Sequence, residues 1–570
     1  MSAPATNRGL LTALLDRFVG KQAGLPPEKC HYVTSEVRIP VTNKDERFEL
    51  MGNLYRPILT DPSSKSCGTV LVHGPYGRGI ELTVRYAHLY AARGYHVLFI
   101  SSRGTYGSQG TWQPFRTEAF DGQVIVRWMR EQPWYTGSFA TIGMSFLGYT
   151  QLALLSEPPK DMVAAVMEVP PHDVGEFCWG AGAMNMDLVV WSEGVKNQGE
   201  PSIFDFLGPF YRAWSLLGAA RRLQPVFDGV PLLDAARKHF GSRSPWVHEW
   251  IARSNPSDPY YEPMRQSRAL DVAKIPILLI AGWHDVLLTQ NLEQHRRLTA
   301  HNHKIGLIIG PWAHTQLEGT ITETFSWLET HLAQQPNTNP QQKQWDEASA
   351  RIFITGINEW RMLPQWPPAG TTPLTFFLHP DRLLSHILPA DSPESKPSFT
   401  FDPRSPTPTI GGPFIGIQAG IRDDTALSAR PDVLTFTTAP LDSALPIFGA
   451  PSIAFAHESD TPHVDLLVRI SEVGLDGRSR NVTEGYQRLD PKREKGEEVR
   501  FGLRECAHVF AKGTRVRVYV AGGSSRIWHR NPGTGEDAVR AGEVRAATHW
   551  IGCGTGTGTV SRVVVPVLEG

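Results

Sequence analysis

The apolar positions between residues 68 and 310 fall in short continuous runs, separated by longer stretches that are compatible with helix. The runs are GTVLVHG (68–74), YHVLFIS (95–101), SFATIG (138–143), MVAAVMEV (162–169), IPILLIAG (275–282) and KIGLIIG (304–310). Continuous apolar runs are typical of strands covered on both faces, as in a parallel sheet with crossover helices. Stretches such as FDGQVIVRWMREQPW supply those helices. The pattern therefore predicts an α/β fold.

One gap between the predicted strands is too long for an ordinary crossover. About a hundred residues separate Val169 from Ile275, whereas most connections in compact domains are far shorter. The gap is rich in aromatic residues, namely Phe177, Trp179, Trp191, Phe204, Phe206, Phe210, Tyr211 and Trp214. We expect residues 170–274 to form an inserted, mostly helical cap, with most of these rings in its core.

The pattern changes after roughly residue 335, where short alternating runs are separated by turns rich in Pro, Ser and Thr. The runs are PLTFFLHP, DVLTFTTAPL, SIAFAHE, VDLLVRISEV, TRVRVYVAGG and VSRVVVPVLEG. Many short strands between turn signals predict an antiparallel β-sandwich or jelly roll over residues 336–570. We expect the stretch 388–412 to be a long surface loop within it. Residues 1–169 and 275–335 are left to the α/β domain.

Charge and composition exclude several classes of partner. With 56 basic and 57 acidic residues, the chain offers no electrostatic basis for binding nucleic acid or an anionic membrane. Five scattered cysteines (Cys30, Cys67, Cys178, Cys506 and Cys553) show no zinc-type spacing. Reduced thiols in a cytoplasmic protein without metal or cofactor are the simplest interpretation.

The N-terminal stretch MSAPATNRGLLTALLDRFVGK predicts a short amphipathic helix rather than a secretion signal, because Asp16 and Arg17 interrupt its apolar patch. No run reaches the ~18 apolar residues that a membrane span needs. We therefore expect a soluble protein that does not bind membranes. A homodimer is compatible with these features but is not required by them.

Three polar residues each follow the end of a predicted strand: Ser145 after SFATIG, Asp285 after IPILLIAGWH, and His314 after KIGLIIGPWA. In an open parallel sheet, ligands bind outside the carboxyl ends of the strands. Three distant segments thus bring a hydroxyl, a carboxylate and an imidazole to one edge of the sheet. Their order along the chain is that of the α/β-hydrolases.

The three side chains together provide what nucleophilic catalysis requires. A serine hydroxyl is a poor nucleophile until an imidazole takes its proton, and the imidazole needs a carboxylate to fix its tautomer. Taken singly, Ser145 is more often a helix N-cap, Asp285 a turn former and His314 a loop residue. His284 is a poorer base than His314, because side chains adjacent in an extended segment point apart.

The turn around Ser145 departs from the usual G-x-S-x-G pattern. Its sequence is Gly143-Met144-Ser145-Phe146-Leu147-Gly148, so the second glycine comes one position late. We expect both glycines to relieve crowding around a strained turn.

Several motifs resemble those of the CocE/NonD hydrolases, the cocaine-esterase-like relatives of X-Pro dipeptidyl-peptidases and α-amino-acid ester hydrolases. GMSFLGYTQ, AGWHDVLLTQN and GPWAHTQ look like the family's Ser, Asp and His motifs, and RGTYGSQG (103–110) and WMREQPWYTG resemble turns around the nucleophile segment. Downstream matches are INEWRMLPQWPP, FDPRSPTPTIGG, RPDVLTFTTAPL and HRNPGTG. The resemblance covers the chain from about residue 35. It implies an α/β-hydrolase fold with an inserted helical cap and a C-terminal antiparallel β jelly-roll domain.

The resemblance also implies roles for individual residues. Ser145 would be the nucleophile, His314 the general base and then acid, and Asp285 the group that orients His314. The oxyanion hole would be formed by the Phe146 N–H and the hydroxyl of Tyr76, which lies in LVHGPYGRG. Two donors aimed at the developing oxyanion are each worth a few kcal/mol of barrier.

We therefore expect a hydrolase that cleaves a small ester or amide through a covalent acyl-enzyme, without a cofactor. The aromatic cap favours an apolar or aromatic substrate, with Trp179, Phe177 and Trp191 as candidate contacts.

Three alternatives remain open. A peptidase or amino-acyl ester hydrolase would use cap carboxylates such as Asp187, Glu193 or Asp205 to bind a substrate ammonium. An acyltransferase or biosynthetic tailoring enzyme would use the same triad with an acceptor other than water. A non-catalytic jelly-roll binding protein would leave the triad inert.

Overall fold

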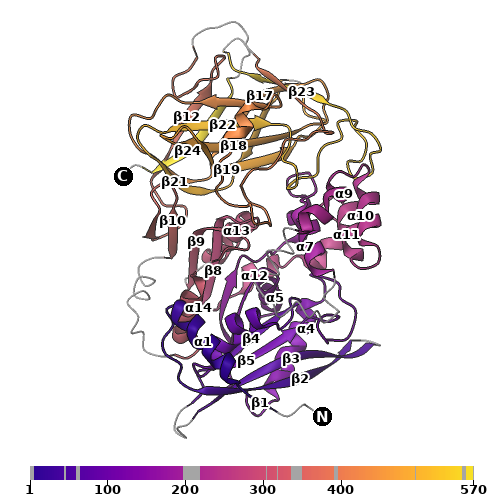
Figure 1. Cartoon of the computed structure of the whole chain (residues 1–570), viewed down its shortest axis with the longest axis vertical. Helices are drawn as coiled ribbons and strands as arrows, with labels where there is room; N and C mark the ends of the chain where they lie inside the picture. Colours follow the sequence, from indigo (N-terminus) through magenta and orange to yellow (C-terminus); the bar gives the residue numbers. More distant parts are fainter. Residues whose placement is uncertain are drawn as a thin grey trace.

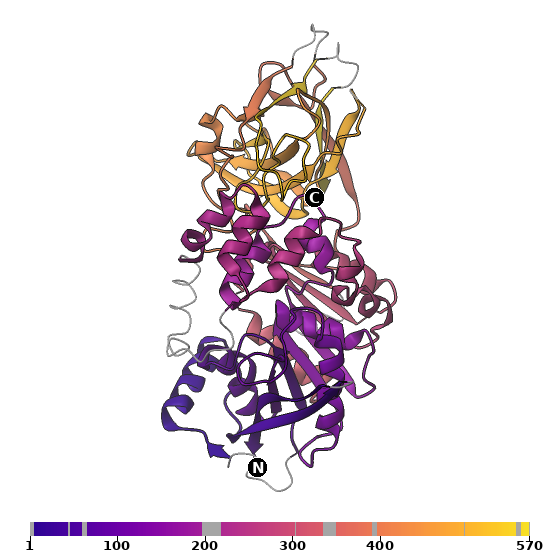
Figure 2. The same ribbon diagram turned by 90° about the vertical axis from the view of Figure 1, so that its right-hand side faces the viewer.

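The computed structural model describes residues 5–43, 46–59, 65–196, 218–302, 304–317, 319–334, 349–389, 396–494, 496–554 and 560–568. Figure 1 shows an elongated molecule, with an α/β domain at one end, a β domain at the other, and a group of helices between them on one side. A quarter turn away, Figure 2 shows the same helices between the two domains. The candidate site described below lies where these three parts meet.

The centre of the α/β sheet is parallel, with strand order β5–β4–β6–β7–β8–β9. These strands are β4 (Thr69–Gly74), β5 (His96–Ser101), β6 (Phe139–Met144), β7 (Met162–Glu168), β8 (Ile277–His284) and β9 (Ile305–Ala313). All six apolar runs of the sequence form strands, so the predicted α/β fold is confirmed. Successive residues Leu71 and Val72 are buried in different cores, because both faces of the sheet are covered.

Helices cover the two faces of this sheet. They are α1 (Leu10–Gln22), α2 (Ile80–Thr83), η1 (Val84–His88), α3 (Leu89–Ala91), α4 (Glu118–Arg130), α5 (Phe146–Leu155), α13 (Leu288–Thr299) and α14 (Thr320–His331). The predicted N-terminal helix is α1. Leu10, Leu11 and Phe18 are exposed on it, and its inner face buries Asp16, which pairs with Arg8.

Further strands, most of them antiparallel to their neighbours, extend the sheet at both edges. On one side lie β1 (Thr6–Asn7), β2 (His31–Asn43) and β3 (Glu46–Ile58), and on the other lie β10 (Ala350–Ile354) and β11 (Glu359–Leu363). The sheet therefore continues past residue 335, where the sequence analysis ended the α/β domain. The alternation of buried and half-buried residues in β10 imitates a sandwich strand, but β10 pairs with β9 and shares its core.

The described part of the segment between β7 and β8 is mainly helical. It contains α6 (Val174–Trp179), α7 (Asp187–Val195), α9 (Gln224–Phe227), α10 (Leu232–Phe240), α11 (Pro245–Ala252), η3 (Pro259–Met264) and α12 (Ser267–Val272). Its aromatic core includes Trp179 and Trp250, and it packs on Phe146 and Tyr149 of α5. The predicted aromatic residues from Phe204 to Trp214 lie outside the described residues.

The C-terminal part consists mainly of two antiparallel sheets around one shared core. The smaller sheet contains β15 (Val433–Thr437), β18 (Asp465–Val473), β19 (Ser479–Arg488) and β22 (Arg515–Ala521). The larger sheet contains β12 (Thr371–Leu378), β13 (Leu384–Ser385), β14 (Ser398–Phe401), β16 (Leu445–Gly449), β17 (Ser452–Ser459), β20 (Glu498–Gly502), β21 (Cys506–Phe510), β23 (Ala547–Gly552) and β24 (Arg562–Leu568). The predicted antiparallel β architecture is confirmed.

The prediction of a surface loop over 388–412 is wrong for its middle part. Residues Ser398–Phe401 form β14, which pairs with β23. Phe399 and Phe401 alternate with polar residues and bury their rings in the shared core, which the surrounding Pro and Ser residues concealed in the sequence. Among the described helices, none combines the length and apolarity needed to cross a membrane.

Candidate active site

Ser145 occupies a sharp turn between β6 and α5. Its backbone angles are φ 54° and ψ −119°, a strained region for a residue with a side chain. Its N–H donates to the Glu168 carbonyl at 2.7 Å, and its carbonyl accepts from the N–H groups of Gly148 and Tyr149 at 2.9 Å. Its side chain makes no capping hydrogen bond to α5, so the turn presents the hydroxyl for another use.

The two glycines of this turn are required by close packing. A Cβ on Gly143 would lie 2.4 Å from the Cβ of Leu147, and Gly143 has φ +155°. A Cβ on Gly148 would lie 2.8 Å from the Cβ of Pro170. The second glycine therefore makes room for the chain that leaves β7.

Ser145, His314 and Asp285 form one hydrogen-bonded chain. The Oγ of Ser145 lies 2.9 Å from Nε2 of His314, and Nδ1 of His314 lies 2.9 Å from Oδ2 of Asp285. The other oxygen of Asp285 accepts from the Leu287 N–H at 2.7 Å. The three side chains meet because β6, β7, β8 and β9 are adjacent and parallel, so that their carboxyl ends share one edge.

Burial and nearby carboxylates act in opposite directions on His314. Burial lowers the pKa of His314, but the charge and hydrogen bond of Asp285, together with the charge of Asp187, outweigh it and raise that pKa above its ordinary value. The protonated form of His314 is therefore stabilised. A general base needs this, because it holds a proton during the reaction.

Asp187, the first residue of α7, is a second buried carboxylate in this region. Its Oδ1 accepts from the Ile415 N–H of the β domain at 2.7 Å. Within the described residues its Oδ2 is buried without a hydrogen-bond partner. Burial raises the pKa of Asp187 to about 7, while the Ile415 N–H and the charges of His314 and Arg504 act to lower it.

Tyr76 and Phe146 lie where the sequence analysis expects the oxyanion donors. The Tyr76 hydroxyl, in the segment after β4, donates to Ser145 Oγ at 3.4 Å and accepts from Nε1 of Trp191 at 3.1 Å. Phe146 is the first residue of α5, so its N–H has no acceptor within the helix. The Tyr76 hydroxyl is thus in contact with Ser145 Oγ, and the Phe146 N–H belongs to the next residue of the chain.

The three aromatic residues predicted to contact substrate occupy different places. Trp191 stacks on Phe146, with ring centroids 5.9 Å apart, and so belongs to the Ser145 site. The Trp179 indole donates to the Trp250 carbonyl inside the cap core. Phe177 lines a separate cavity of about 400 Å³ between the cap and the β domain.

Two further aromatic rings beside Phe146 were missed from the sequence. Phe115 lies 4.5 Å and Trp112 lies 6.4 Å from Phe146, measured between ring centroids. Both follow the RGTYGSQG turn directly, which was the only local indication of their position.

The other candidates of the sequence analysis are engaged elsewhere. Glu193 is paired with Lys196, Arg222 and His239, and Asp205 lies outside the described residues. Burial lowers the pKa of His284 to about 4. In the described part of the chain, no group of three or more His, Cys, Asp or Glu side chains is placed to hold a metal ion.

Comparison with known proteins defines the class. Residues 47–316 match the X-Pro dipeptidyl-peptidase (S15 family), and residues 341–559 match the X-Pro dipeptidyl-peptidase C-terminal non-catalytic domain. The chain therefore belongs to this family of hydrolases, together with its cocaine-esterase-like members, and the resemblance seen in the motifs is confirmed.

Individual relatives span nearly the whole chain. Cocaine esterase of Rhodococcus sp. (strain MB1 Bresler) is 23% identical over 94% of this chain and 99% of its own. An α-amino acid ester hydrolase structure has a TM-score of 0.76 at 21% identity, covering 94% of this chain and 96% of that one. An aminopeptidase from a marine sediment Thaumarchaeota archaeon has a TM-score of 0.74 at 19% identity, covering 94% and 97%. These two structures share the fold.

Proposed function

We propose that this protein is a serine hydrolase that cleaves a small ester or amide through a covalent acyl-enzyme on Ser145. The observation that carries the proposal is the continuous contact from Ser145 Oγ to His314 and on to Asp285, with 2.9 Å at each step. We take the α/β domain as an α/β-hydrolase fold and the β domain as a jelly roll, in line with the family.

The first half of the reaction forms the acyl-enzyme. Ser145 Oγ attacks the substrate carbonyl carbon while its proton passes to Nε2 of His314. The Tyr76 hydroxyl and the Phe146 N–H donate to the oxygen that becomes negative. Collapse of the tetrahedral intermediate breaks the bond to the leaving alcohol or amine, which takes the proton from His314.

The second half regenerates the enzyme. Water gives a proton to His314 and its oxygen attacks the acyl carbon, and the carboxylic acid leaves as Ser145 recovers its proton. Asp285 stays ionised and holds the imidazolium in place throughout. The wall formed by Trp112, Phe115 and Trp191 favours an apolar or aromatic acyl or alcohol group beside Ser145.

A second candidate function is favoured by Asp187. Its buried Oδ2 has no partner among the described residues, and an amino-acyl ester or peptide would bring an ammonium that can pair with it. Comparing hydrolysis of an amino-acid ester with a free amine and of its N-acetylated form separates the two functions. A preference for the free amine that is lost in Asp187→Asn supports the second candidate, and equal rates exclude it.

Ser145→Ala tests the proposed function. We expect turnover of a p-nitrophenyl ester to fall by about 10⁴- to 10⁶-fold, with an unchanged circular dichroism spectrum. The matched control is Ser102→Ala, because Ser102 is also buried beside a histidine, with its Oγ 3.5 Å from His73. Full turnover by the Ser145 variant, or equal losses in both variants, would overturn the assignment.

A further inference from the structure

Arg504 of the β domain reaches across to the segment that carries Asp285. It lies between β20 and β21, and its guanidinium donates to the backbone carbonyls of Asp285 and Val286, at 2.7 Å from Nη1 and 3.0 Å from Nη2. The contact joins residues that are 219 and 218 positions apart in the sequence. A side chain of the domain described in the family as non-catalytic thus touches the backbone of the triad's acid.

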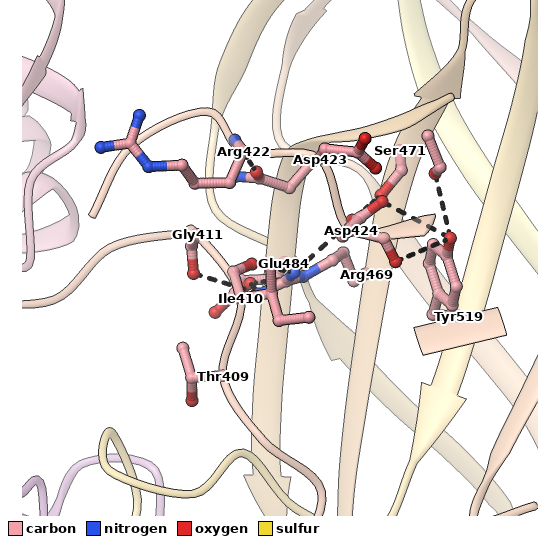
Figure 3. A network of polar contacts seen from close by, with 12 residues as sticks. Thr409, Ile410, Gly411, Arg422, Asp423, Asp424, Arg469, Ser471, Glu484 and Tyr519 are labelled. Atoms are coloured by element: carbon pink, nitrogen blue, oxygen red, sulfur yellow. Dashed lines mark hydrogen bonds and ion pairs between the residues drawn. The ribbon is translucent and has the colours of Figure 1, made fainter. Parts of the chain in front are cut away.

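Arg504 is itself held firmly by its own domain. Its N–H donates to the Glu484 carbonyl at 3.0 Å, and its carbonyl accepts from the Thr483 hydroxyl at 2.6 Å. Both partners belong to β19. The Glu484 side chain pairs in turn with buried Arg469, as Figure 3 shows. The backbone of Arg504 is therefore fixed to β19 of the smaller sheet, and its guanidinium extends from there.

The two carbonyl contacts restrict how the acid can rotate. The Asp285 carboxylate accepts from the Leu287 N–H. The planar guanidinium of Arg504 holds the backbone carbonyls of Asp285 and Val286 together. Burial lowers the pKa of Arg504, and the charges of Glu484, Asp285 and Asp187 oppose that lowering.

We propose that Arg504 is a positioning residue of the active site, through which the β domain holds Asp285 in the orientation that His314 needs. The inference rests on the proposed function and adds a role for the β domain in it. Loss of the contact would let Asp285 move relative to His314, and a displacement of about 1 Å can cost 10²-fold in rate.

A cavity beside Arg504 allows the missing side chain of a variant to be replaced by a free guanidinium ion. The cavity of about 400 Å³ is lined by Arg504, Val286 and Leu287, together with residues of α6 and α13 and of the β domain. Removing the arginine side chain leaves room there for a free guanidinium ion to reach the same two carbonyls.

The test measures p-nitrophenyl ester hydrolysis by Arg504→Ala with and without guanidinium chloride in the tens-of-millimolar range. We expect kcat to fall by about 10- to 100-fold with KM changed less than about threefold, and added guanidinium to restore part of kcat. Arg504→Lys should stay below the parent protein, since one ammonium cannot reproduce the two-pronged contact.

Arg296→Ala is the matched control. Arg296 also links the α/β domain to the β domain, through Glu505 at 2.7 Å. In the described structure it makes no hydrogen bond to Asp285 or Val286. We expect kcat of this variant to stay within about twofold of the parent protein and not to respond to guanidinium.

The outcomes are separable from those of the proposed function. Full kcat in Arg504→Ala, or a loss that guanidinium does not restore while Arg504→Lys is fully active, overturns the positioning role. If Arg504→Ala fails to fold, Arg504→Lys decides: reduced kcat at unchanged KM supports the role, and parental kcat contradicts it. Failure of the proposed function appears instead in the parent protein, as a Ser145 that a fluorophosphonate does not label.

Discussion

The buried charges around His314 and those around Arg469 are equally removed from water, but they are partnered in different ways. Arg469 and Asp424 of the β domain are 1% and 0% exposed, and His314 and Asp285 are 6% and 0% exposed. Figure 3 shows the Arg469 cluster, which we define as Arg469, Asp424 and Glu484 with the carbonyls of Ile410 and Gly411.

The polar side-chain atoms of the Arg469 cluster are partnered within the cluster or by neighbouring protein groups. Asp424 also accepts from Ser471 at 2.7 Å, and within the described residues no buried side-chain atom of the cluster lacks a partner. Around His314, by contrast, Ser145 has strained backbone angles and Asp187 Oδ2 has no partner in the described chain. Phe146 is the first residue of α5, so its N–H has no acceptor within the helix. The Arg469 cluster is therefore partnered by protein groups, whereas the region around His314 keeps one buried carboxylate oxygen without a protein partner among the described residues.

After loss of the Ser145 hydroxyl, the largest expected effect comes from a change at Asp285. Asp285→Asn keeps the shape of the side chain but removes the charge that fixes the His314 tautomer, so we expect kcat to fall by about 10⁴-fold. Ester hydrolysis and thermal unfolding are measured together. Asp161→Asn, which alters a carboxylate paired with Arg130 away from the site, serves as the control. A fall in kcat below tenfold would contradict the role of Asp285.

The converse change breaks the Arg469 cluster. Arg469→Met leaves Asp424 and Glu484 buried without their cation, and we expect the free energy of unfolding to fall by about 3–5 kcal/mol. Kcat of the folded fraction should fall by less than tenfold. Denaturant unfolding of this variant is compared with Arg478→Ala, which removes an exposed partner of Asp423 and should cost no more than about 1 kcal/mol. Similar losses in both variants would remove the contrast between the clusters.

Loss of one oxyanion donor should have the next largest effect. Tyr76→Phe removes the hydroxyl that contacts Ser145, and we expect kcat to fall by about 10²-fold with little change in KM. Trp191→Phe removes the N–H that donates to Tyr76 and part of the ring that stacks on Phe146, but it leaves the Tyr76 hydroxyl in place, so its loss should stay below about tenfold. Steady-state kinetics with one ester measure both variants. A larger loss in the Trp191 variant would place the donor elsewhere.

The smallest expected effect is in the pH profile. Because only neutral His314 accepts the serine proton, kcat/KM should fall about tenfold per pH unit below its pKa, with a midpoint above the ordinary value of 6.5. The groups facing His314 are Ser145, Asp285 and Asp187. Asp187→Asn removes one negative charge and should move the midpoint toward lower pH. A shift in the opposite direction would contradict the electrostatic account.

The meeting of Ser145, Asp285 and His314 could be predicted from the sequence because apolar runs fix where parallel strands end. Ser145, Asp285 and His314 each follow such a run, and the chain order completed the pattern. Asp187 was one of three cap carboxylates that the sequence could not rank. Its place beside His314 separates it from Glu193, which is paired with Lys196, Arg222 and His239.

Contacts between domains could not be predicted in this way. The placement of Arg504 on the Asp285 carbonyl and of Ile415 on Asp187 depends on how the β domain docks, and no local pattern encodes that docking. The sheet positions of β10 and β14 could not be predicted either, because an alternating pattern is the same whichever sheet the strand joins. The ends of single helices and strands can therefore be predicted from the sequence, whereas their partners across a domain boundary cannot.

Covalent labelling tests most directly whether the His314 cluster is a working nucleophilic site. The folded protein is treated with a fluorophosphonate probe, and the modified peptide is identified by mass spectrometry. We expect one adduct on Ser145, formed more slowly in Asp285→Asn and absent in Ser145→Ala. A folded protein that remains unlabelled, or one labelled at Ser102 beside His73 instead, would contradict the central claim.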